Sequence, residues 1–299
     1  MDPCFKITDT RIAARPLDRI LGDLQTFVHE ERESSDGIVL DLRRTAFIDP
    51  YGMVLLCLIG RYLRESFDRV VYRLPESSQV RSYLSRMRFL KTLAKSVSLQ
   101  GWSPYEGQEV RGKTESEALL EITKIEERDD IESVLEYINV RVSTILAEEL
   151  GYTVREITKF KYVIAELGHN ILDHSLNWGY VVAQRYTDPR ENLKFVVIGV
   201  GDLGVGIKRS LSSRFDVSGW THGRSILNAL KKNFSRDPAR GLGLYVVNQI
   251  CNDYNGSLHI RSGDTRVYLR GRNIYEHVST FFPGTQVGIA LYERTSSET

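Results

Sequence analysis

One stretch of the chain, GWSPYEGQEVRGKTES at residues 101–116, shows no apolar period and is rich in Gly, Pro and polar side chains. A stretch of this kind connects folded units and does not build a core of its own. It divides the 299 residues into two parts, each long enough to bury its own core. We therefore predict two domains, residues 1–110, which include the start of the linker, and residues 111–299.

The composition is that of a folded protein and excludes several classes. Hydrophobic residues make up 41% of the chain and charged residues 26%, which argues against global disorder. The 40 basic and 39 acidic residues leave a net charge of +1, so the overall charge does not indicate binding to nucleic acid or an anionic membrane. The three cysteines lack CxxC spacing and support neither a disulfide framework nor a zinc site.

No segment predicts a membrane span or a secretory signal. The longest apolar run, residues 53–59, is far shorter than the roughly 20 residues that a spanning helix needs. The N-terminal sequence MDPCFKITD lacks a basic region followed by an apolar stretch. We expect a cytoplasmic protein with neither a membrane nor a nucleic-acid partner.

The first part alternates between strand and helix patterns. GIVLDL at residues 37–42 and residues 70–74 read as strands, and residues 51–64 and 80–93 read as amphipathic helices. This alternation predicts an α/β domain.

The second part begins with a strand pattern at residues 119–125, followed by two long helical patterns at residues 130–150 and 153–174. Strand patterns follow at residues 178–186 and 193–201, then a helix after Gly241 and strands near residues 257–260, 267–269 and 286–292. We predict an α+β sandwich with helices on one face of a mixed sheet.

Three polar residues share one face of the second predicted helix. Glu166, Asn170 and His174 are four residues apart, and each step of four turns only about 40° around a helix. Apolar residues supply the opposite face, so this polar stripe faces either a cleft or solvent.

A carboxylate and two glycines follow a predicted strand in the segment DLGVGI. Asp202 offers an acceptor for an amino group, and Gly204 and Gly206 let a flat base approach the backbone closely. A tight turn after a strand is the alternative interpretation.

A glycine-rich turn precedes the helix that follows Gly241. It consists of Arg240, Gly241, Leu242 and Gly243, and the start of a helix favours phosphate. It is not a P-loop, because no GK[ST] follows. Residues 203–240 contain eight basic and two acidic residues, which fits either a mobile segment that closes over a polyphosphate or a charged exposed loop.

Four motifs in this order, ExxxNxxxH at Glu166, DxGxGI at Asp202, GLGL at Gly241 and PGTQVGIAL at residues 283–291, resemble the GHKL superfamily of gyrase, Hsp90, histidine kinase and MutL ATPases. The resemblance covers about residues 115–295 and implies a Bergerat-type α/β sandwich that binds ATP with Mg²⁺. It implies that Asn170 holds Mg²⁺ against the phosphates and that Asp202 receives the amino group of adenine.

The same resemblance implies roles for the remaining candidate residues. Gly204 and Gly206 would floor the base pocket, Thr285 would lie near adenine, and Glu166 would activate the attacking water or hydroxyl. The turn from Arg240 to Gly243 would face the phosphates. His174 either orders the helix of Asn170, touches phosphate or serves as a structural histidine.

Within the superfamily, the ExxxNxxxH helix most resembles that of the anti-sigma serine kinases. The first part supports this likeness, because residues 41–63 resemble a STAS domain of the anti-sigma antagonists. That family has a phosphorylatable serine directly before a glycine, whereas this chain has Tyr51 before Gly52. Whether Tyr51 is modified stays open.

These observations predict an ATP- and Mg²⁺-binding regulatory protein similar to anti-sigma serine/threonine kinases, with a STAS-like domain that lacks the phosphoacceptor serine. The alternative is a GHKL ATPase without kinase activity that acts as a conformational or dimerisation switch on a partner protein. The partner, a sigma-factor-like regulator or an effector, is not specified by the sequence, and neither is a homodimer. A sensor histidine kinase fits less well, because residues 130–150 contain no histidine.

Overall fold

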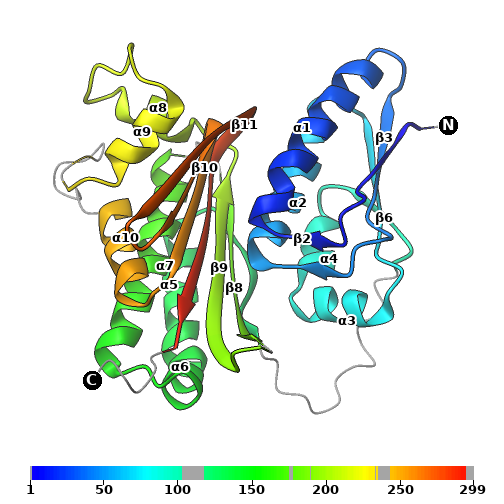
Figure 1. Cartoon of the computed structure of the whole chain (residues 1–299). Helices are drawn as coiled ribbons and strands as arrows, with labels where there is room; N and C mark the ends of the chain where they lie inside the picture. The colour runs from blue at the N-terminus through cyan, green and yellow to red at the C-terminus, as the bar shows by residue number, and fades with distance from the viewer. Residues whose placement is uncertain are drawn as a thin grey trace.

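The computed structural model describes residues 2–102, 118–174, 178–188, 190–232, 234 and 243–293. It is a mixed α/β structure with a four-stranded parallel sheet and a five-stranded antiparallel sheet (Figure 1). The parallel sheet belongs to the part of the chain before the predicted linker, and the antiparallel sheet belongs to the part after it. The predicted boundary at residue 110 lies outside the described residues.

We call the described residues 2–102 the N-terminal unit and the described residues from 118 onward the C-terminal unit. In the N-terminal unit the strand order is β1-β3-β5-β6. These strands are β1 (Cys4–Lys6), β3 (Gly37–Asp41), β5 (Arg69–Arg73) and β6 (Ser98–Gln100), and a separate parallel pair is β2 (Arg11–Ile12) and β4 (Phe47–Ile48). The helices are α1 (Ala14–Glu31), α2 (Pro50–Leu63), α3 (Ser78–Arg86) and α4 (Phe89–Leu93). The strands predicted at residues 37–42 and 70–74 and the helix predicted at 51–64 are confirmed to within one residue at each end.

The single helix predicted at residues 80–93 is wrong, because α3 and α4 are separate helices. Arg88 lies between them in the left-handed region, with a φ of 56°, and this conformation ends a right-handed helix. The break turns Phe89, Leu90 and Leu93 into the core of the unit, where all three are buried.

Helix α2 is apolar on nearly every side and is the central helix of the molecule. Asp49 caps its N-terminus by accepting the backbone N–H of Gly52 at 2.7 Å, and Pro50 occupies the first helical position. Twelve of its 14 residues are buried, including the run from Met53 to Ile59. A helix with this pattern must be covered on more than one face.

In the C-terminal unit the strand order is β10-β11-β9-β8-β7, and every neighbouring pair is antiparallel. The strands are β7 (Ala118–Ile125), β8 (Gly179–Asp188), β9 (Leu193–Asp202), β10 (Ser257–Arg270) and β11 (Asn273–Tyr292). The helices are α5 (Arg128–Tyr137), α6 (Ser143–Leu150), α7 (Val154–His174), α8 (Gly206–Leu211), α9 (His222–Ala229) and α10 (Gly243–Asp253). The prediction of a mixed sheet is wrong for the described strands, because the β10–β11 hairpin places β11 antiparallel to β9.

Two further predictions in this unit need correction. The helix predicted at residues 130–150 is interrupted by a π-helical turn at Ile138–Val142, where the Ser143 hydroxyl donates to the carbonyl oxygen of Ile138 at 3.0 Å. The three strands predicted after residue 256 are two long strands, because the irregular register at Gly263 interrupts the apolar pattern without ending β10.

The antiparallel sheet is covered on both faces. Side chains such as Val196, Ile198 and Val200 point to the core shared with helices α5 to α7 and α10. The opposite face carries Tyr180 and Val182, which belong to the core of the N-terminal unit. The N-terminal unit therefore packs against the sheet face that the C-terminal helices leave free (Figure 1), and α2 contacts β9 closely.

Glycines on this second face allow α2 to approach the sheet closely. A Cβ at Gly199 would lie 2.5 Å from the carbonyl oxygen of Pro50, and a Cβ at Gly288 would lie 3.0 Å from Cδ2 of Tyr51. Gly199 and Gly288 are direct neighbours across β9 and β11. Any larger residue at Gly199 would therefore push α2 away from the sheet.

An ionic cluster around the buried Arg261 also joins the two units. Asp18 of α1 forms ion pairs with Arg261 and Arg266 of β10, and Arg261 also donates to the carbonyl oxygen of Thr280. The side chain of Arg261 is 0% exposed. Nearby, the amide of Gln25 donates to the carbonyl oxygen of Phe281 at 2.5 Å.

Candidate functional site

Asp202 is the last residue of β9, and its side chain is buried at that end of the sheet. Its carboxylate accepts the backbone N–H of Gly204 at 2.6 Å, and the backbone N–H of Thr285 also donates to it. Burial raises the pKa of Asp202 to about 7, although the two N–H donors act in the opposite direction. The sheet therefore ends in a buried acid that changes its charge near neutral pH.

The turn at residues 283–285 lies directly against Asp202. Gly284 has a φ of 80°, and a Cβ there would lie 2.1 Å from the carbonyl oxygen of Asp202, so only glycine fits. The amide of Gln286 donates to the carbonyl oxygens of Asp202 and Pro283, each at 2.9 Å. Gln286 thus holds β9 and this turn together, which places Thr285 beside Asp202.

Gly206 joins the same group through Ser262 of β10. The hydroxyl of Ser262 accepts the backbone N–H of Ile207 at 2.9 Å and donates to the carbonyl oxygen of Gly284 at 3.1 Å. Gly206 has a φ of 73°, and a Cβ there would lie 2.8 Å from that hydroxyl. The predicted residues Asp202, Gly204, Gly206 and Thr285 therefore lie together at one end of the sheet.

Glu166 lies against the start of α10. A Cβ at Gly243 would lie 2.8 Å from Oε1 of Glu166, so the carboxylate occupies the space beside this glycine. The hydroxyl of Tyr162, one turn earlier on α7, hydrogen-bonds to Glu166, and burial together with this carboxylate raises the pKa of Tyr162. The structure thus places Glu166 of the predicted polar stripe beside Gly243 of the predicted glycine-rich turn.

Helix α7 also reaches the end of the sheet where Asp202 lies. A Cβ at Gly179 would lie 3.0 Å from Cγ2 of Ile171, and Gly179 pairs with Asp202 across β8 and β9. Asn170, the residue before Ile171, is half-buried. The helix that carries Glu166 and Asn170 therefore connects the surroundings of Gly243 to the surroundings of Asp202.

Some predicted residues lie outside the described part of the chain. Arg240, Gly241 and Leu242 are among them, and so is the side chain of His174, although its backbone ends α7. The basic segment at residues 203–240 is described at residues 203–232 and 234, and it contains α8 and α9. Leu211 and Ile226 are buried in the core, so this described part is packed onto the unit.

Three residues around the site were not predicted from the sequence. Gln286 and Ser262 are buried in the structure. A polar residue within a predicted apolar strand is the sequence signal that could have identified them. Tyr162 stands four residues before Glu166, a spacing at which two helical side chains meet.

Tyr51 and α7 lie on opposite faces of the antiparallel sheet. Tyr51 is 2% exposed, contacts Gly288 and forms an edge-to-face contact with the ring of His259, with centroids 5.0 Å apart. These residues are on the sheet face covered by the N-terminal unit, whereas α7 packs on the other face. Burial also raises the pKa of Tyr51 above its usual range.

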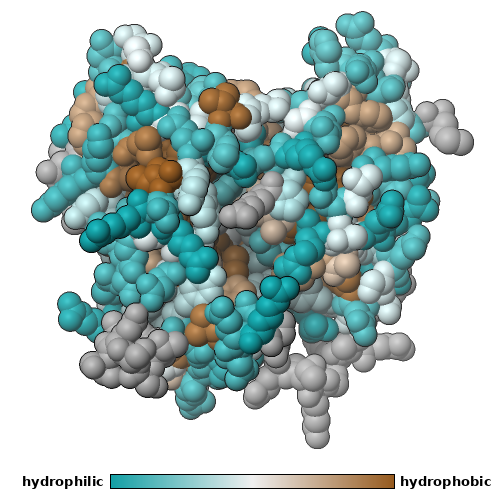
Figure 2. All heavy atoms as spheres, viewed as in Figure 1, coloured by the Kyte–Doolittle hydropathy of each residue, from teal (hydrophilic) through white to brown (hydrophobic). Residues whose placement is uncertain are grey.

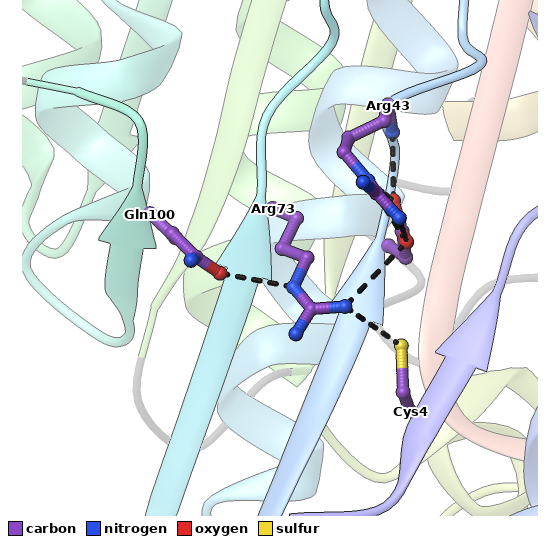
Figure 3. Close-up of polar contacts among 5 residues, drawn as sticks. Cys4, Arg43, Arg73 and Gln100 are labelled. Carbon is purple, nitrogen blue, oxygen red and sulfur yellow. Dashed lines mark hydrogen bonds and ion pairs between the residues drawn. The ribbon is translucent and has the colours of Figure 1, made fainter.

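A second polar cluster lies at the carboxyl ends of β3, β5 and β6 and includes Cys4, the first residue of β1 (Figure 3). Arg43 donates to both carboxylate oxygens of Asp41, with a shortest distance of 2.7 Å, and this bond lowers the pKa of Asp41. Arg73 lies 3.8 Å from the same carboxylate and donates to Gln100 at 2.9 Å and to the sulfur of Cys4 at 3.4 Å. The cluster ties β1, β3, β5 and β6 together at their ends.

Within the described residues, no helix combines the length and the apolar character that crossing a membrane requires. The same part of the chain contains no cluster of three or more His, Cys, Asp or Glu side chains arranged to hold a metal ion. No protein-family model matches the chain, and no curated protein matches it.

Proposed function

We propose that this chain is an ATP- and Mg²⁺-binding regulatory protein of the GHKL type, similar to the anti-sigma serine/threonine kinases. In this proposal the antiparallel sheet and its helices form a Bergerat-type sandwich, and the N-terminal unit is a STAS-like domain. The observation that carries the proposal is the buried carboxylate of Asp202, which shares one end of the sheet with Gly204, Gly206 and Thr285.

The surroundings of Asp202 suit a flat heterocycle that carries an amino group. An ionised carboxylate only accepts hydrogen bonds, and the amino group of adenine donates them. Gly204 and Gly206 carry no side chain that would keep a base away from the backbone. The carboxylate already accepts two backbone N–H groups, and its remaining lone pairs can accept the amino group of a base as well.

The surroundings of Glu166 suit a polyphosphate with Mg²⁺. Gly243 opens α10, a helix of 11 residues whose first N–H groups and dipole favour an anion. Asn170 carries an amide oxygen, a hard ligand of the kind that Mg²⁺ takes. When bound, Mg²⁺ would neutralise charge on the phosphate oxygens.

Glu166 is the candidate general base. Its carboxylate is half-buried beside Gly243, where it can accept the proton of an attacking water or hydroxyl. The hydrogen bond with Tyr162 orients this carboxylate.

In this proposal the N-terminal unit is a docking or autoinhibitory domain and not the phosphate acceptor. The burial of Tyr51 against the antiparallel sheet supports this assignment, because a residue that is 2% exposed does not reach an active site on the other face. The acceptor would then be a separate protein partner, a sigma-factor-like regulator or an effector.

The test is phosphate transfer from labelled ATP to candidate partners, together with ATP binding by calorimetry. Glu166→Ala should bind ATP with Mg²⁺ as tightly as the wild type but lose at least about 100-fold in transfer or hydrolysis, because the general base is removed. Glu148→Ala, which changes an exposed glutamate on α6, is the matched control and should keep both properties. A wild-type protein that binds no ATP would contradict the proposal as a whole.

A nucleotide-driven switch without kinase activity is the second candidate, and the β10–β11 hairpin favours it. Its β11 half exposes four large hydrophobic side chains, Ile274, Tyr275, Val278 and Phe281, of which Val278 is 80% exposed. Among the hydrophobic areas on the face shown in Figure 2, one lies at the upper end of this hairpin. Exposed apolar groups of this kind mark surfaces for a partner or a second copy of the chain. Nucleotide-dependent dimerisation and phosphate release without labelled protein would favour this candidate.

A further inference from the structure

Helix α2 of the N-terminal unit contacts β9 directly beside Asp202. A Cβ at Gly201 would lie 2.9 Å from Cγ1 of Val54 and 3.1 Å from Cδ1 of Leu58. Gly201 immediately precedes Asp202 at the end of β9. The packing of the N-terminal unit therefore extends to the residue next to the buried carboxylate.

Gln286 completes the connection from the other side of Gly201. It pairs with Gly201 across β11 and β9, and its Cγ lies 3.1 Å from the position of a Cβ on Gly201. Its amide donates to the carbonyl oxygens of Asp202 and Pro283, and its side chain is 0% exposed. Val54 and Leu58 of α2 thus pack against Gly201, and Gly201 packs against Gln286. Gln286 in turn hydrogen-bonds to the backbone of Asp202 and of the turn that contains Thr285.

The position of α2 is itself fixed within the N-terminal unit. The hydroxyl of Tyr72 donates to the carbonyl oxygen of Leu56 in the middle of the helix at 2.9 Å. A Cβ at Gly60 would lie 2.9 Å from Cγ1 of Val97, so the far end of the helix is equally close-packed. Close-packed interiors transmit a displacement because they contain little free space to absorb it.

We propose that α2 supports the nucleotide site from the opposite face of the sheet and that Gln286 is the positioning residue through which Val54 and Leu58 hold Asp202 in place. This inference rests on the proposed ATP-binding function and adds a regulatory mechanism to it. Nucleotide affinity and the packing of the N-terminal unit are then coupled, and the coupling acts equally in both directions. A partner that moves α2 changes ATP affinity, and ATP stabilises α2 against the sheet.

The first test is Gly201→Ala in the full chain, with Gly219→Ala as the control, because a Cβ at Gly219 has no atom within 4 Å. The added methyl group displaces α2 or β9, so ATP with Mg²⁺ should bind about 10-fold more weakly. Tripolyphosphate with Mg²⁺ lacks the base and should bind as it does to the wild type. This difference separates a change at Asp202 from general destabilisation, which would weaken both ligands.

The second test asks whether the effect passes through α2. Val54→Ala removes the methyl group nearest to the added Cβ. Combined with Gly201→Ala, it should restore at least half of the lost ATP affinity on a logarithmic scale. No recovery in the double variant would mean that the distortion stays within β9, and the inference would be overturned.

Gln286→Met tests the positioning residue itself. Methionine keeps the length of the side chain but removes both amide hydrogen bonds, so ATP should bind at least about 5-fold more weakly while tripolyphosphate binding is unchanged. Gln79→Met, on the exposed surface of α3, is the matched control. Equal ATP affinity in Gln286→Met and the wild type would exclude a positioning role.

Hydrogen exchange of the wild-type protein provides a test that needs no variant to fold. Backbone amides of α2 should exchange more slowly with ATP and Mg²⁺ than with tripolyphosphate and Mg²⁺. Unchanged exchange in a protein that binds ATP would overturn this inference and leave the proposed function intact. Absence of ATP binding by the wild type would overturn both.

Discussion

At the scale of single residues, Asp202 shows how the surroundings set the chemistry of an ordinary side chain. Two backbone N–H groups favour its ionised form, whereas burial favours the neutral form and has the larger effect. Its pKa of about 7 makes the carboxyl a mixture of both forms near neutral pH. Only the ionised form offers both oxygens as acceptors to an amino group.

ATP affinity should therefore depend on pH. Below a pKa of about 7 the site must first lose a proton, so ATP should bind roughly 10-fold more weakly at pH 6 than at pH 8. Calorimetry with saturating Mg²⁺ measures this difference, and tripolyphosphate with Mg²⁺ serves as the reference for titration of the phosphates. Asp202→Asn should bind ATP weakly with no such dependence, and a wild type that matches the tripolyphosphate profile would contradict the role of Asp202.

The sequence identifies residues whose chemistry is local more readily than residues that act through contacts. Asp202, Gly204 and Gly206 stand in one short segment after a strand, and the structure keeps them together with Thr285. Gln286 contacts Asp202 only because β11 and β9 pair in a particular register. Register depends on the whole sheet, so no local pattern predicts that contact.

At the scale of elements, α2 carries an unusual N-terminal cap. Asp49 accepts the backbone N–H of Gly52 at 2.7 Å, yet burial raises the pKa of this carboxyl to about 7. Its usual pKa is 3.8, so the folded state holds the proton at pH values where the unfolded chain has lost it. This group therefore stabilises the fold at low pH, and that stabilisation is lost as pH rises towards 7.

Asp49→Asn should remove this dependence and keep the cap, because asparagine is an equally good capping residue. Between pH 4 and pH 8 the unfolding free energy of the variant should rise relative to that of the wild type by on the order of 3–4 kcal/mol, because the pKa of Asp49 is raised from 3.8 to about 7. Urea unfolding at both pH values measures the gain. Asp68→Asn, which changes an exposed residue, is the control, and equal gains in both variants would contradict the assignment.

The elements themselves follow the sequence where the pattern is strong and depart from it where a single backbone conformation decides. The sequence predicts an amphipathic helix at residues 51–64, and the structure confirms the helix but buries it on nearly every side. The left-handed Arg88 between α3 and α4 and the π-helical turn at Ile138–Val142 leave the apolar pattern unchanged, so that pattern cannot reveal them. Strand direction in the second sheet likewise depends on which strands become neighbours.

At the scale of the whole molecule, the two units share one continuous structure through the second face of the antiparallel sheet. Glycines bring α2 within contact of β9 and β11, and Asp18 forms ion pairs with the buried Arg261 and the partly exposed Arg266 of β10. The linker composition predicts two units but gives no information on this contact, because complementary surfaces are far apart in sequence. The N-terminal unit is therefore part of the support of the candidate site.

The Asp18 cluster allows a quantitative test of this arrangement. Asp18→Ala leaves Arg261 buried without its carboxylate partner, which should cost about 3–5 kcal/mol of unfolding free energy. Asp23→Ala, on the exposed side of α1, should cost less than about 0.5 kcal/mol. Denaturant unfolding followed by tryptophan fluorescence provides the comparison, and equal losses in the two variants would show that the cluster does not hold the units together.

A triple variant decides whether the cluster stabilises the contact or only specifies its geometry. Asp18→Leu with Arg261→Met and Arg266→Met replaces the ions by apolar groups, and buried ion pairs often gain little over such replacements because charges lose their hydration on burial. We expect this variant to recover most of the stability that Asp18→Ala loses. ATP binding by the same variant is the second measurement. If the variant is stable but binds ATP more weakly than the wild type, then the ionic geometry sets the position of α1 and α2 on the sheet, and the cluster contributes to the nucleotide site through their placement.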